Sequence, residues 1–205
     1  MAKRALWPVM AVLAVLVAMY AAALLVAPQL RPPFLQSSRL PLALMVHFGG
    51  GAVAMALGPF QFRASQRARR PVLHRWMGRV YVAAILGSGT AGLALAFFSQ
   101  GGAVAHAGFG LLAAAWLVTT SLAFLAIRQG DTVAHQRWMI RSFSLTFAAV
   151  TLRVYLPLGL ALGIPFEVAY PIIAWACWVP NLIVAELLQS SPVRRLRPDS
   201  VTAGS

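Results

Sequence analysis

The chain has 205 residues, of which 60% are hydrophobic and only 10% are charged. Soluble domains typically carry about 25% charged residues, so this composition excludes an ordinary soluble fold. The net charge of +13 does not indicate a nucleic-acid-binding protein, because the arginines are spread between apolar segments and form no exposed basic domain. The sequence also contains no glycine-rich phosphate loop, nucleophile elbow or H-E-x-x-H motif.

Six apolar segments follow one another along the chain, and each is long enough to cross a bilayer core of about 30 Å. They cover residues 6–28, 41–62, 76–98, 103–127, 138–160 and 168–188. Because they leave no room for a soluble domain, we predict an all-α integral membrane protein with six transmembrane helices. One domain would cover residues 1–190, followed by a disordered polar tail over residues 191–205. The first segment is too long for the apolar part of a signal peptide, so we expect an uncleaved helix.

The basic residues alternate between connections. Lysine and arginine gather at residues 3–4, 63–75, 128–141 and 194–197, whereas the other connections are nearly free of them. By the positive-inside rule, this alternation predicts six spans with both termini in the cytoplasm. The basic surplus would also attract the anionic headgroups of the lipid bilayer.

The four histidines are divided among the middle four helices. His47 and His106 are expected near the outer face, and His74 and His135 at or just before the cytoplasmic starts of their helices. At a rise of 1.5 Å per residue, the stretch from His47 to Arg63 spans about 24 Å. The sequence therefore predicts two layers of histidines, roughly 20 Å apart.

A sequence motif with basic and aromatic residues occurs twice, as "HRWMGR" beginning at His74 and "HQRWMIR" beginning at His135. A histidine of the outer layer, His47 or His106, precedes each copy by 27 or 29 residues. This spacing predicts a two-helix unit used twice, so that the second to fifth helices form a four-helix core. Repeats of this kind commonly place sites at their interface, which would pair His47 with His106 and His74 with His135.

Two facing imidazoles at each end of a helical core are typical of haem b ligation. We therefore predict two b-type haems with the four histidines as axial ligands of the iron, forming an electron-transfer path across the bilayer. Arg153 would lie in the outer half, where a haem propionate would compensate its charge. Arg79 and Arg141 would serve the same purpose at the inner end. The expected partner is a quinol or a small reductant on the basic face.

Two alternatives remain open at this stage. Small residues line the helix face of His47 at positions 50, 51, 54 and 58, which would leave room for a flat macrocycle or would equally permit close helix packing. The protein would then be a cofactor-free bundle that transports a small solute or serves as an accessory subunit. The same imidazoles would also suit copper or zinc.

Several other residues have simpler interpretations. Trp76 and Trp138 are expected to anchor their helices at the membrane interface. Asp131 is expected to cap the start of the fifth helix. Glu186 is a candidate for moving protons.

Three long phrases carry a resemblance to a known family: "HFGGGAVAMALGPFQF" (47–62), "HRWMGRVYV" (74–82) and "HQRWMIRSFSLTFAAVTLRVY" (135–155). They resemble the bacterial membrane proteins catalogued as domain of unknown function 2306 (DUF2306), which implies a multi-pass protein of the bacterial cytoplasmic (inner) membrane and no particular activity. The architecture also resembles the cytochrome b-561 proteins, in which the second and fourth of six helices hold one haem and the third and fifth hold the other. That resemblance implies a membrane oxidoreductase with the same histidine pairs. The shorter histidine intervals and the shallow positions of His74 and His135 depart from it.

Overall fold

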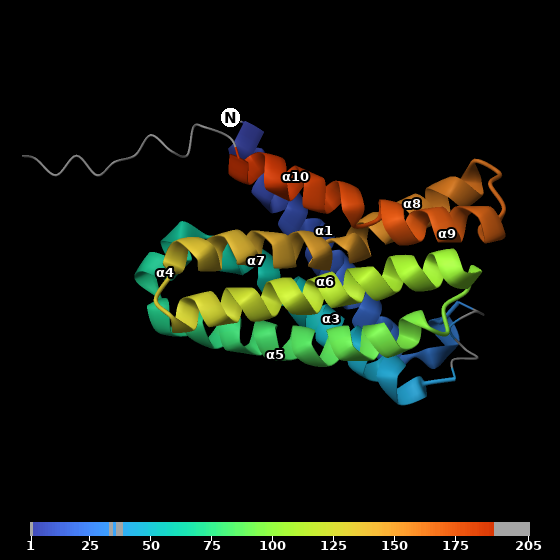
Figure 1. The fold of residues 1–205 in the computed structure, drawn as a ribbon, viewed down its shortest axis with the longest axis horizontal. Coiled ribbons are helices and arrows are strands. Elements are labelled where there is room, and N and C mark those ends of the chain that lie inside the picture. The colour runs from blue at the N-terminus through green and yellow to red at the C-terminus, as the bar shows by residue number, and fades with distance from the viewer. Residues whose placement is uncertain (1, 33–34, 36–38, 191–205) are drawn as a thin grey trace, which may run out of the picture.

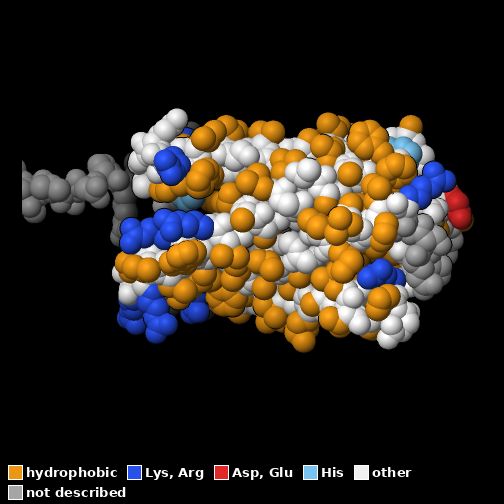
Figure 2. Space-filling model, turned by 90° about the horizontal axis from the view of Figure 1, so that it is seen from below, with side chains coloured by type: hydrophobic (Ala, Val, Ile, Leu, Met, Phe, Trp, Pro, Cys, Tyr) orange, Lys and Arg blue, Asp and Glu red, His pale blue; other side chains and the backbone are white. Residues whose placement is uncertain are grey.

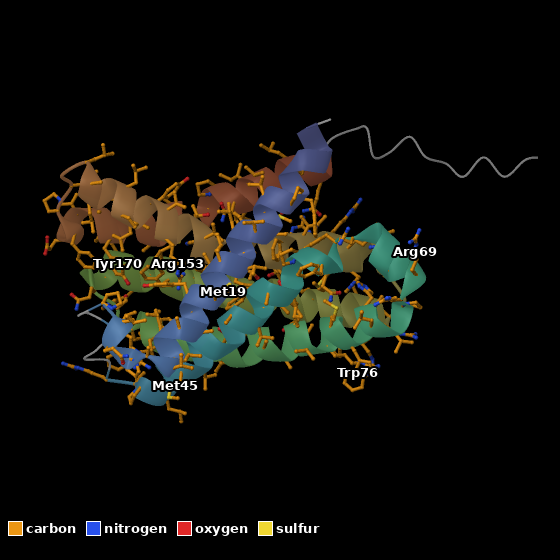
Figure 3. All side chains as sticks on the ribbon, turned by 180° about the vertical axis from the view of Figure 1, so that it is seen from behind. Met19, Met45, Arg69, Trp76, Arg153 and Tyr170 are labelled. Carbon is orange, nitrogen blue, oxygen red and sulfur yellow. The ribbon has the colours of Figure 1, made fainter. Side chains whose placement is uncertain are left out.

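The computed structural model describes residues 2–32, 35 and 39–190. Long helices lie side by side along the longest axis of the molecule, and α1 crosses the others obliquely (Figures 1 and 3). The start of α1 and the end of α10 lie at the same end as the short helix α4 (Figure 1). The predicted disordered tail, 191–205, lies outside the described residues.

All regular structure in the described part of the chain is helical. The elements are α1 (Ala2–Val26), a 3-10 helix η1 (Pro28–Leu30), α3 (Pro41–Gln61), α4 (Ala64–Arg69), α5 (Pro71–Ala96), α6 (Gly102–Arg128), α7 (Thr132–Thr146), α8 (Ala148–Ala161), α9 (Phe166–Ala176) and α10 (Val179–Ser190). By length and composition, six stretches of the described residues are able to cross a membrane; α7 with α8 forms one of them, and α9 with α10 another. The predicted all-α fold with six spans is confirmed.

Two helices begin earlier than the sequence pattern predicted. Helix α5 begins at Pro71 instead of residue 76, and α7 begins at Thr132 instead of residue 138. Proline is well suited to a first helical position because its backbone angle is already helical. Asp131 caps α7 as expected, since its Oδ1 accepts a hydrogen bond from the Ala134 N–H at 2.8 Å. His74 and His135 therefore lie inside helices, and their expected position at or before the helix starts was wrong.

Four helices form a core, and the remaining ones pack against part of its outside. Helix α3 packs on α5, α5 on α6, and α6 on α7, while α1 packs on the outside of α3. Helix α9 covers α6 and α8, and α10 packs against α7. The fifth span leaves the core after Phe147, so α7 belongs to the core and α8 lies outside it.

The face of α3 that carries His47 is packed closely against its neighbours. A Cβ atom at Gly50 would lie 2.6 Å from the Ala84 carbonyl oxygen of α5, and a Cβ atom at Gly58 would overlap the ring of Phe143. The sequence left two roles open for these small residues, which were room for a flat macrocycle or close helix packing. In this structure they allow close packing of the helices.

Buried hydroxyl groups join three core helices at the centre of the bundle. The Tyr81 hydroxyl on α5 lies 3.2 Å from Ser142 Oγ and 3.0 Å from Thr146 Oγ1, both on α7. On α6, Trp116 Nε1 donates to Thr146 Oγ1 at 2.9 Å, and Thr120 Oγ1 lies 2.7 Å from Ser142 Oγ. Because every polar group in this cluster has a partner, the cluster holds α5, α6 and α7 in register without lowering the stability of the core.

Replacing Tyr81 by phenylalanine is expected to lower the free energy of unfolding by about 1 kcal/mol, in the range of interhelical hydrogen bonds in membranes. The loss stays small because Thr146 keeps Trp116 as a donor and Ser142 keeps Thr120. Unfolding by dodecyl sulfate, followed by circular dichroism, would measure it. Tyr155, 38% exposed on α8, provides the matched control, since Tyr155→Phe removes a hydroxyl outside this cluster. Equal losses in the two variants would contradict the role assigned to the cluster.

Candidate functional site

His74 and His47 mark two levels of the bundle. We call the end that carries α4 and the exposed residues Arg67, Arg69, Arg70 and Arg75 the basic end, and the opposite one the far end (Figure 2). His74 and His135 lie toward the basic end. His47 hydrogen-bonds to Ser88, fourteen residues further along α5 than His74, so the two levels are about 21 Å apart. This separation agrees with the value expected from the sequence.

At the basic end, two histidines from different helices come near each other. His74 on α5 lies within electrostatic reach of His135 on α7, and of Arg67. The Nδ1 of His135 lies 2.8 Å from the Ala123 carbonyl oxygen of α6. Because a carbonyl only accepts, Nδ1 carries the proton, and Nε2 keeps its lone pair. The His135 ring is thus held in the tautomer that a metal ligand needs.

A buried amide lies close to this pair. Gln61, at the end of α3, is buried, and within the described part of the chain its Nε2 has no hydrogen-bond partner. Its Oε1 lies 3.8 Å from the position that a Cβ of Gly78 would occupy, and Gly78 is one turn after His74 on α5. An unpaired donor in such a place is unusual, because a buried polar group without a partner costs about 1–3 kcal/mol.

His47 is held between α3 and α5. Its Nδ1 donates to the Ser88 carbonyl oxygen at 2.9 Å, and the Ser88 hydroxyl donates to the His47 carbonyl oxygen at 2.8 Å. Gly92 makes room for the ring, because a Cβ atom there would lie 2.8 Å from His47 Nδ1. As with His135, the bond at Nδ1 leaves Nε2 as the nitrogen available to a ligand.

His106 is oriented differently. Its Nε2 donates to the Ser99 carbonyl oxygen at 2.8 Å, in the connection between α5 and α6. The rings of His47 and His106 are therefore each bonded to the backbone of a different segment, Ser88 and Ser99, and the hydrogen bonds do not join them to each other. The sequence did not show which way the two rings turn. Because Ser99 lies eleven residues beyond Ser88 and follows the end of α5, His106 also lies nearer the far end than His47, and the common level expected for the two was wrong.

Arg153 lies on α8 toward the far end (Figure 3). Its guanidinium is 5.3 Å from the centre of the Tyr20 ring of α1, and its Nη1 donates to the Ala149 carbonyl oxygen at 2.9 Å. It is also within electrostatic reach of His47. Within the described residues its buried Nε has no hydrogen-bond partner. A cation this deep in a bilayer costs about 2.5–3.5 kcal/mol on insertion scales, so its charge calls for an anionic partner.

The two other arginines predicted to bind cofactor occupy equivalent positions in the repeated phrase. Arg79 stacks over Trp76 at 5.5 Å, and Arg141 stacks over Trp138 at 4.6 Å. Arg141 is in addition paired with Glu186 of α10 through two bonds, of 2.5 and 2.7 Å. Its charge is thus already compensated by a carboxylate, which the sequence alone did not reveal because the contact depends on where α10 docks.

Within the described residues, no three side chains of His, Cys, Asp or Glu come together as a metal-binding cluster. A structural zinc site normally has four such ligands. The residues gathered here are instead His74 with His135 and Gln61 toward the basic end, and His47 with Arg153 at the other level.

Comparison with known proteins gives one match. A family model described as "Predicted membrane protein (DUF2306)" matches residues 44–189, from the first turn of α3 almost to the end of α10. No curated protein and no solved structure matches the chain.

Proposed function

The chain belongs to the DUF2306 family of predicted membrane proteins, and we propose that it carries electrons across the membrane through two b-type haems. One observation carries the proposal. At each level a core histidine, His135 or His47, gives its Nδ1 proton to a backbone carbonyl and keeps Nε2 free. Histidines that bind metals almost always donate their other ring N–H in this way, which fixes the ring and raises its basicity.

Each level also contains a buried N–H donor without a partner in the described part of the chain: Gln61 Nε2 toward the basic end and Arg153 Nε toward the far end. Carboxylate groups on a bound cofactor would satisfy both donors. At Arg153 such a group would also neutralise the charge. Both levels thus suit a ligand that has an iron atom for the imidazole nitrogens and carboxylate groups for the N–H donors. Haem has both.

The middle of the bundle is closed to a cofactor. Tyr81, Trp116 and Phe143 are buried there in one apolar cluster. The proposed haems would therefore lie at the two ends, held by His74 and His135 and by His47 and His106. To share a haem with His47, His106 must release the Ser99 carbonyl and turn toward the basic end, so binding there would lose one hydrogen bond that the His135 site keeps.

The orientation in the membrane is part of the proposal. Arginines gather at the basic end, and the surface between the two ends is mainly apolar (Figure 2). Because the positive-inside rule keeps arginine-rich connections in the cytoplasm, the basic end and both termini would face the cytoplasm of a bacterium. A quinol or a small reductant would then deliver electrons there, close to His74.

An absorption spectrum tests the proposal directly. The full chain, expressed with ample haem and purified in mild detergent, is expected to show a low-spin b-type spectrum on reduction. A pyridine haemochrome assay is expected to give about two haems per chain, one for each histidine pair. A folded but colourless protein would contradict the proposal. The closely packed α3–α5 interface would then favour a cofactor-free bundle that transports a solute or supports another complex.

A further inference from the structure

A hollow at the basic end combines positive charge with an apolar wall. It has a volume of about 610 Å³ and is lined by Arg69, Arg70, Pro71, Val72, Leu73 and Trp76, where α4 meets α5. The apolar side chains are strongly exposed, at 59% for Val72, 40% for Leu73 and 59% for Trp76. Arg69 and Trp76 lie at the same end of the molecule in Figure 3.

The arginines around this hollow form no ion pair with a described residue. Asp131 is the first acidic residue in the chain, so none occurs between residues 1 and 130. In the part of the chain that the structure describes, the ion pair is that of Arg141 with Glu186 on the other side of the core. Arg67, Arg69 and Arg70 are all exposed. These arginines are therefore available to an anion from outside the protein.

We infer that this hollow binds an anionic diacyl phospholipid of the membrane leaflet at the basic end. The phosphate would lie between Arg69 and Arg70, each of which offers several N–H donors to phosphate oxygens. An acyl chain would cover Val72, Leu73 and the Trp76 ring. Trp76 sits where aromatic side chains usually mark the boundary between headgroups and hydrocarbon. The division of the hollow into a cationic rim and an apolar wall matches the two parts of a phospholipid.

Variants of Arg69 and Arg70 would distinguish lipid binding at this hollow from general attraction of the protein to a charged surface. Attraction of a basic segment to an anionic surface is worth about 1 kcal/mol for each arginine. The double variant Arg69→Gln with Arg70→Gln is therefore expected to bind the lipid about 25-fold more weakly. Arg128→Gln is the matched control, because Arg128 is an exposed arginine of α6 outside the hollow. It is expected to keep the affinity of the unchanged protein.

Native mass spectrometry of the full chain in detergent would measure this binding. The probes are phosphatidylglycerol, phosphatidylcholine with the same acyl chains, and glycerophosphoglycerol, which has the headgroup but no chains. Phosphatidylglycerol is expected to bind best, and Trp76→Ala is expected to weaken it without affecting the headgroup alone. Equal binding of the two phospholipids would overturn the inference, as would an equal loss in Arg128→Gln. Stronger binding of glycerophosphoglycerol would show a site for free phosphate esters instead. Because no haem enters the measurement, its outcome is independent of the proposed electron transfer.

Discussion

Replacing His74 by alanine is expected to remove one of the two proposed haems completely and to leave the other in place. A low-spin b-type haem needs two axial nitrogens, and at the basic end these would come from His74 and His135. His47 lies about 21 Å away along the bundle, which is far enough for the two sites to behave independently. The haemochrome assay should thus give about half the haem of the unchanged protein. His135→Ala is expected to have the same effect.

The companion variants assign each haem to its level. His47→Ala should remove the other haem, and the double variant with His74→Ala should be colourless. Trp76→Phe is a suitable control, because Trp76 is two residues from His74 and points to the exposed side of α5. Full haem content in His74→Ala, in a protein that still folds, would contradict the assignment. So would the loss of both haems in any single variant whose thermal stability is unchanged.

The number and order of the spans could be predicted because a bilayer leaves few choices. Backbone groups in hydrocarbon must bond within their own segment, so each apolar run of sufficient length becomes a helix. The starts of α5 and α7 were placed too late because Arg75 and Arg137 lower the hydropathy of their first turns. Pro71 and Asp131 were the better signals, since each fixes a helix start through its own local geometry.

The spacing between His74 and His47 followed from the rise per residue, but the position of His106 and the contacts of each ring did not. Periodicity placed His47, Gly50 and Gly58 on one face of α3, and only the packing of α5 and α7 shows what that face touches. The pairing of Arg141 with Glu186 likewise depends on the docking of α10. Sequence patterns thus identified which residues share a helix face, whereas contacts between helices depend on packing that periodicity does not encode.

Replacing Gly50 by alanine is expected to destabilise the packing of α3 on α5. The new Cβ would lie 2.6 Å from the Ala84 carbonyl oxygen and 2.8 Å from Ser88 Cβ. Because backbone cannot turn away as a side chain does, α3 and α5 would have to separate. Overpacking of this kind usually costs about 1–3 kcal/mol. Separation would also stretch the bond between His47 and the Ser88 carbonyl, which is 2.9 Å long.

The adjacent glycine provides a control that differs by one position. A Cβ atom at Gly51 would lie 3.7 Å from Ser88 Oγ, which is ordinary van der Waals contact, so Gly51→Ala should change stability little. Unfolding by dodecyl sulfate, followed by circular dichroism, would compare the two variants with the unchanged protein. If both alanines destabilised the protein equally, the loss would reflect the helix-wide effect of removing glycine and not the contact with Ala84. If Gly50→Ala alone lost stability and far-end haem together, close packing of α3 on α5 would be what holds His47 in place.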